Sequence, residues 1–110
     1  MCPQICYGKK MSELEDKLEF ELKAIGYNPE KEVKFHPSRR WRFDFVIGNL
    51  AIEVEGGVWM GKSRHTSPKG FINDCEKYAE ALMLGYRVLR IPGDWVNNGK
   101  AIGYIERALK

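Results

Sequence analysis

The chain has 110 residues, of which 44% are hydrophobic and 30% charged, a composition typical of one folded domain and not of a disordered chain. The 18 basic and 15 acidic residues give a formal net charge of +3, too small to identify a nucleic-acid-binding protein by itself. No apolar run approaches membrane-spanning length, which argues against a membrane protein. Three cysteines without zinc-type spacing favour a reducing, cytoplasmic setting.

Residues 1–10 are expected to form a flexible leader and residues 11–110 a single domain. The first helix is predicted to begin at Ser12, because Ser12 and Glu15 form a capping box, and to end before Gly26. Its apolar face recurs at helical spacing and consists of Leu14, Leu18, Leu22 and Ile25.

Three strands are predicted next, at 32–35, 42–47 and 50–55. The second and third alternate in character, and Gly48-Asn49 between them is typical of a tight hairpin turn. In the second strand we expect Phe43, Phe45 and Ile47 on one face and Arg42, Asp44 and Val46 on the other. In the third, Leu50, Ile52 and Val54 are expected to oppose Ala51, Glu53 and Glu55.

A loop rich in glycine and basic residues follows, up to about Gly70. A second long helix is predicted at 71–84, a fourth strand at 87–91 and a final helix at 101–109. The second helix is expected to turn an apolar stripe toward the core, formed by Ile72, Cys75, Ala79 and Leu82. The predicted class is α/β, a single domain with an α-β-β-β-α-β core in which helices flank a mixed sheet.

Three carboxylates lie on the two strands of the predicted hairpin. Glu53 and Glu55 leave the same face of their strand, and a suitable register brings Asp44 beside Glu53. Neighbouring carboxylates repel one another and favour a counter-cation, and Mg²⁺ prefers such oxygen ligands. The alternative is that these acids form the solvent-facing half of an exposed hairpin.

The sequence resembles the PD-(D/E)XK nuclease superfamily at these residues. The predicted order of elements matches its core, which implies a restriction-endonuclease-like fold. Asp44 occupies the position of the motif aspartate and Glu53 that of the second acid, whereas Glu55 stands where lysine is usual. Small phage- and prophage-encoded nuclease-like proteins are the most similar group, and very-short-patch repair endonucleases are more distant. The similar stretches are RRWRFDF, AIEVEGGVW, RHTSPKGF, DCEKY and GYRVLRI.

The resemblance implies a magnesium-dependent endodeoxyribonuclease, with Mn²⁺ as a possible substitute. Asp44 and Glu53 are expected to bind the metal, aided by the Val54 carbonyl. Glu15 is an outer ligand or only a capping residue. Glu55 and Lys77 are expected to position the attacking water. Lys77 would take the place of a lysine that has migrated to the following helix, or it merely pairs with Asp74 on the helix surface.

DNA is the expected partner, because basic residues flank the acidic stretch on both sides. They are candidates for phosphate contacts, although a solvated basic face would look the same. The alternative function is a DNA structure- or end-binding module that does not cleave. A domain of this size has little recognition surface, so a homodimer or a larger phage partner is also expected. The candidate DNA-binding residues are Arg39, Arg40, Arg42, Lys62, Arg64 and His65.

Overall fold

The computed structural model describes residues 11–55 and 68–110. The leader expected at 1–10 and most of the basic loop, including Lys62, Arg64 and His65, lie outside the described residues. No helix of the described ranges is long and apolar enough to cross a membrane.

Four strands form one sheet in the order β1-β2-β3-β4. They are β1 (Glu30–Lys34), β2 (Arg42–Ile47), β3 (Leu50–Glu55) and β4 (Arg87–Pro92). The first three are antiparallel to their neighbours and β4 is parallel to β3, so the predicted mixed sheet of an α/β domain is confirmed. The β2–β3 turn contains Gly48 at φ +62°, a conformation that glycine adopts without steric cost.

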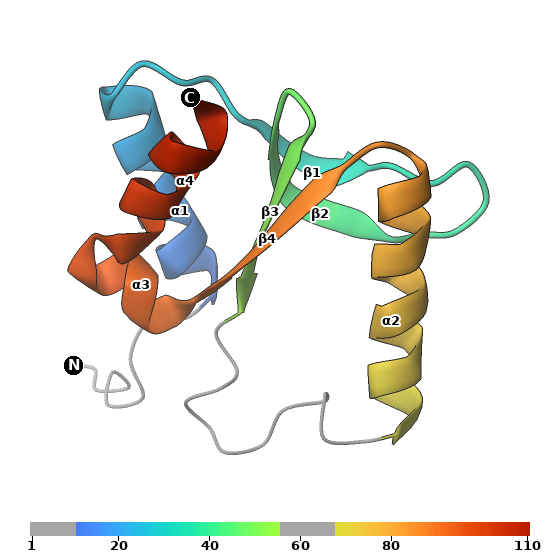
Figure 1. Cartoon of the computed structure of the whole chain (residues 1–110). Coiled ribbons are helices and arrows are strands. Elements are labelled where there is room, and N and C mark those ends of the chain that lie inside the picture. Colours follow the sequence, from blue (N-terminus) through green and yellow to red (C-terminus); the bar gives the residue numbers. More distant parts are fainter. Residues whose placement is uncertain (1–10, 56–67) are drawn as a thin grey trace.

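Three helices cover one face of the sheet (Figure 1). They are α1 (Met11–Ala24), α3 (Gly93–Asn98) and α4 (Lys100–Leu109). Gly99, at φ +84°, ends α3 and separates it from α4. Helix α3 was not predicted from the sequence, whereas α4 corresponds to the final helix expected at 101–109. The main core lies between these helices and β2, β3 and β4. Its fully buried members include Leu18, Leu22, Phe45, Ile52, Ile91 and Ile105.

Helix α2 (Pro68–Met83) stands alone on the other side of the sheet (Figure 1). A smaller core lies on this side and contains Phe43, Val46, Ala51 and Ala81. Phe43 therefore packs with Val46 and away from Phe45, so the expected facing of β2 is wrong at Phe43. In β3 the expected facing holds, because Leu50, Ile52 and Val54 join the main core while Ala51 joins the smaller one.

The expected inward stripe of α2 is also wrong. Ile72 is 64% exposed, Leu82 is 68% exposed, and Cys75 and Ala79 are exposed as well. The helix turns its opposite face to the sheet, where Ala81 is buried and Asp74, Lys77 and Tyr78 are half-buried. The physical reason is the sheet surface beneath it, which presents a small apolar patch and the polar Glu53, a partner for Lys77 and Tyr78.

Truncating Leu18 to alanine is expected to lower the free energy of unfolding by about 2–5 kcal/mol, because this fully buried side chain leaves a cavity in the main core. Phe20→Ala is the matched control, since Phe20 lies on the same helix and is 73% exposed. Its effect should stay below about 0.5 kcal/mol. Urea denaturation measures both, and equal losses would contradict the described packing of α1.

Candidate functional site

The β2–β3 hairpin brings Asp44 beside the acids of β3. The register pairs Ile47 with Leu50 and Phe45 with Ile52, and one more step along both strands places Asp44 opposite Glu53. The backbone N–H of Val54 donates a hydrogen bond of 2.8 Å to Asp44 Oδ2. The adjacency expected from the sequence is therefore present, and a backbone donor fixes the Asp44 carboxylate.

Glu15 reaches the same point from α1 and forms a side-chain hydrogen bond with Asp44. Burial and then the charge of Asp44 raise the pKa of Glu15 from its ordinary value of 4.5 to about 7. Burial also raises the pKa of Asp44, against the opposing effect of the Val54 N–H, and the charge of Glu53 adds to the rise. The two carboxyl groups thus share a proton, which Glu15 donates to Asp44.

Glu53 is nearly inaccessible, at 8% exposed, and both of its carboxylate oxygens are engaged by α2. Lys77 Nζ forms an ion pair with Oε2, and Tyr78 Oη donates a hydrogen bond of 2.6 Å to Oε1. Burial and then the hydrogen bond to Glu53 raise the pKa of Tyr78 far above its ordinary value, so the phenol remains a donor. Lys77 also donates to the Arg42 carbonyl at 2.9 Å, which ties α2 to β2.

Glu55 points to a different partner. Arg90 on β4 donates to Glu55 Oε2 at 3.2 Å, so Glu55 takes part in a cross-strand ion pair. Within the ranges 11–55 and 68–110, no group of three or more His, Cys, Asp or Glu side chains gathers in a geometry that could hold a metal ion. The ligands expected from the sequence, Asp44, Glu53, the Val54 carbonyl and Glu15, stay a prediction.

The carboxylates that do meet can still accept a hard cation. Mg²⁺ commonly binds to one or two protein carboxylates and completes its shell with water and substrate phosphate. Glu15 and Asp44 supply such a pair, in which the charge of Asp44 adds to the raised pKa of Glu15. Glu53 would have to give up Lys77 or Tyr78 to become a third ligand.

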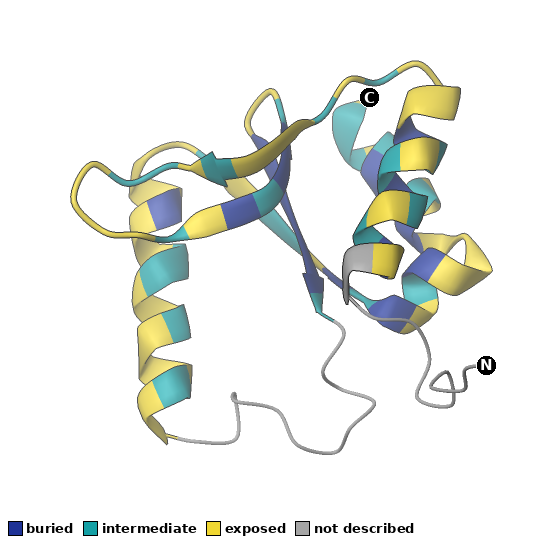
Figure 2. Ribbon diagram, turned by 180° about the vertical axis from the view of Figure 1, so that it is seen from behind, coloured by how far each residue is buried: buried dark blue, intermediate teal, exposed yellow. Residues whose placement is uncertain are grey.

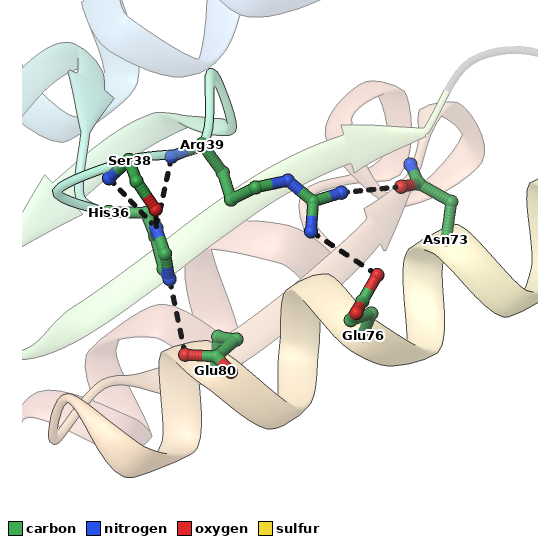
Figure 3. Close-up of polar contacts among 6 residues, drawn as sticks. All are labelled: His36, Ser38, Arg39, Asn73, Glu76 and Glu80. Atoms are coloured by element: carbon green, nitrogen blue, oxygen red, sulfur yellow. Dashed lines mark hydrogen bonds and ion pairs between the residues drawn. The ribbon is translucent and has the colours of Figure 1, made fainter.

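The expected DNA-binding residues that the structure describes lie near α2 and β1. Arg39 reaches α2, contacting Glu76 at 3.3 Å and Asn73 at 3.4 Å (Figure 3). Its guanidinium also stacks on Trp41, 3.9 Å from the ring centroid. Arg42 forms an ion pair with Glu32 at 2.6 Å. Arg40 is exposed. These arginines lie on the surface, and two of them already have acidic partners.

Three residues of this neighbourhood were missed from the sequence. Tyr78 neighbours Lys77 in DCEKY, but nothing in the sequence showed that both would reach Glu53. Arg90 lies opposite Glu53 in the parallel register of β3 and β4, which has no local signal in the sequence. Glu32 lies opposite Asp44 in the β1–β2 register, has φ +51°, and adds to the raised pKa of Glu15.

Replacing Glu15 with glutamine is expected to stabilise the protein only at neutral and alkaline pH. The pKa of Glu15 is higher in the folded than in the unfolded protein. Its contribution to the free energy of unfolding is therefore fully present below pH 4.5 and is lost as the pH rises through about 7. Glu15→Gln removes this loss. The gain should be about 1 kcal/mol or less after solvent screening, equivalent to a few degrees in Tm. Melting curves at pH 5 and 8 measure it, with the exposed Glu13→Gln as control. A gain equal at both pH values would contradict the shared proton.

The protein is similar in fold to a known protein of solved structure. No protein-family model matches the sequence, and no curated protein matches it significantly. Among solved structures, the fold is similar to that of the catalytic domain of the homing endonuclease I-Bth0305I, with a TM-score of 0.62 and 26% sequence identity. The alignment covers 86% of this chain and 89% of the other. The similarity extends over almost the whole domain, so the chain has a nuclease-like fold.

Proposed function

We propose that the protein is a metal-dependent endonuclease that hydrolyses phosphodiester bonds in DNA. The observation that carries the proposal is the meeting of Asp44, Glu15, Glu53 and Lys77, which come from four separate elements, at the two inner strands of the sheet. The similarity of the fold to that of a homing endonuclease catalytic domain supports a nuclease function. Assignment to the PD-(D/E)XK superfamily, with phage-type relatives, is part of this proposal.

Asp44 and Glu15 are the proposed ligands of Mg²⁺ or Mn²⁺, with the Val54 carbonyl as an additional oxygen on the adjoining strand. Such a metal would lower the pKa of a bound water molecule and would stabilise the negative charge that develops at the phosphate. The chain itself orients the ligands, because the Val54 N–H holds one Asp44 oxygen and leaves the other for Glu15 or a cation. Both carboxyl groups would have to be ionised to hold the cation, so Glu15 would give up its proton.

Lys77 is the proposed substitute for the lysine missing at position 55. Its ammonium lies on Glu53 and on the Arg42 carbonyl, so two acceptors hold it beside the motif acids. From there it can donate to an attacking water or to a phosphate oxygen that gains charge. Glu55, which pairs with Arg90, then has a structural role at the end of β3. Tyr78 is a positioning residue, because it acts through Glu53.

The proposed substrate contacts are with the phosphate backbone. Arg39, Arg40 and Arg42 lie on the connection into β2 and at its start, close in sequence to Asp44. Charges of this kind attract a polyanion and position it without reading its sequence. Sequence recognition would require further surface, from a second copy of the chain or from a larger partner such as a phage replication or packaging protein.

Asp44→Asn is expected to lower cleavage of supercoiled plasmid by at least roughly 100-fold, because it removes a proposed metal ligand. Asp94→Asn is the control, since Asp94 is exposed on α3. Addition of Mg²⁺ at pH 8 should raise the Tm of the unchanged protein and of the control, but not that of Asp44→Asn. Equal cleavage by all three proteins would show that the metal site lies elsewhere.

Lys77→Ala is expected to lower cleavage by roughly 100-fold while the Tm shift on adding Mg²⁺ is retained, because the proposed metal ligands are untouched. Lys69→Ala is the control, as Lys69 is exposed near the start of α2. Lys77→Arg should recover part of the activity if a positive charge is needed at this point. If Lys77→Ala cleaves like the control, Lys77 has only the structural role of neutralising Glu53.

A DNA-binding module that does not cleave is the second candidate. It is favoured by one observation, the engagement of both Glu53 oxygens by Lys77 and Tyr78, which keeps the second motif acid from a metal. This function predicts salt-dependent DNA binding that is unaltered by Asp44→Asn, with no cleavage in Mg²⁺ or Mn²⁺.

A further inference from the structure

An exposed apolar stripe runs along α2 from Phe71 to Met83, beside the exposed polar residues Asn73, Glu76 and Glu80. Four residues recur at the spacing of a heptad seam, Ile72, Cys75, Ala79 and Leu82, and Phe71 and Met83 flank them; we call these six residues the outer stripe. Phe71 is 59%, Ile72 64%, Leu82 68% and Met83 76% exposed. In Figure 2 the side of α2 turned away from the sheet is coloured as exposed for most of its length.

A patch of this kind is unusual on the surface of a monomer. Single exposed apolar residues are common, but a contiguous row on one helix face marks an interaction surface. The inward face of the helix carries Lys77, Tyr78 and Ala81, so the outer stripe has no role in holding α2 to its own sheet. The N-terminal half of α2 also extends away from the sheet (Figure 1).

We propose that the outer stripe is a self-association surface, on which a second copy of this chain packs its own α2 in antiparallel orientation. The stripe is complementary to itself in this orientation. With the two-fold axis at the level of residue 77, Ile72 of one copy faces Leu82 of the other, and Phe71 faces Met83. Cys75 faces Ala79 on both sides of the axis. Large side chains thus meet at the two ends, and small ones in the middle let the helices approach closely.

The area of the stripe lies near the lower limit for a specific interface. Large apolar side chains at these exposures carry roughly 100 Å² each. Two copies therefore bury most of the roughly 1,000 Å² that a specific interface needs. In the antiparallel orientation, the N-terminal half of each α2, which extends away from the sheet, packs on the C-terminal half of the other α2. That C-terminal half is held to its own sheet through Ala81.

The interface lies on the side of α2 opposite to Lys77 and Tyr78, so both copies keep their candidate sites open. The dimer therefore does not depend on the proposed nuclease function and could exist in a protein that only binds DNA. It would, however, add a second support to the helix that holds Glu53.

Sedimentation equilibrium of the full chain from about 1 to 100 μM tests the association, a range suited to a small interface. The expected result is a monomer–dimer equilibrium whose dissociation constant rises at least roughly tenfold in Leu82→Glu, since a buried leucine is replaced by a charge. Phe20→Glu is the matched control, an exposed apolar residue on α1, and should leave the equilibrium unchanged. A monomer at every concentration, or an equal response in both variants, overturns the proposal.

Disulfide cross-linking tests the orientation. In a Cys2→Ser, Cys6→Ser background, Ala79→Cys should give a covalent dimer under mild oxidation, because position 79 of one copy faces the native Cys75 of the other. The same background with Ala79 intact should not cross-link. A dimer that forms through Cys75 alone indicates parallel helices and rejects the antiparallel arrangement.

Measurements of the melting temperature distinguish two ways of covering the outer stripe. One is a second copy of the chain, and the other is a segment of the same chain that folds onto the stripe. Under the proposal, Leu82→Glu lowers the Tm only at concentrations where the unchanged protein is dimeric. A concentration-independent fall in Tm, in a protein that stays monomeric, would mean that the chain covers its own stripe, and the proposal would fail.

Discussion

The compensation of buried carboxylates governs how this domain is assembled. Glu53 is 8% exposed in the middle of a sheet, and an ionised group in such a place needs a partner of opposite charge and hydrogen-bond donors. Lys77 and Tyr78 provide both from α2, while the Val54 N–H and a proton shared with Glu15 serve Asp44. Helices α1 and α2 therefore make polar contacts with the sheet at these carboxylates and pack through apolar side chains elsewhere.

This arrangement explains which parts of the fold could be predicted from the sequence. Alternation and turn chemistry are local signals, and the bounds that they predicted for β2 and β3 are those observed. Leu14, Leu18 and Leu22 are likewise buried as helical spacing predicted. The facing of α2 could not be obtained in this way, because the apolar stripe of the helix competes with the attraction of Lys77 and Tyr78 to Glu53. Only the tertiary structure shows which interaction prevails.

The candidate site, too, could be predicted from the sequence where local signals determine it, but not where tertiary contacts do. Asp44 and Glu53 are neighbours because two strands and a short turn determine their register, which the sequence contains. Glu55 has the right spacing for the same face, yet Arg90 from β4 draws it into a separate ion pair. Parallel pairing across a long connection has no local signal, so the partners of Glu55 and the approach of Lys77 were open until the strands were placed.

The origin of the site in four elements has a consequence for biosynthesis. A ribosome releases α1 and the β2–β3 hairpin well before α2 and β4, so the early chain carries the acids without the lysine and without the strand that flanks β3. Contacts of long sequence separation form late, after loop closure has been paid for in entropy. Under the proposed function, a chain that ends before α2 lacks Lys77 and does not cleave, although it already carries Arg39, Arg40 and Arg42.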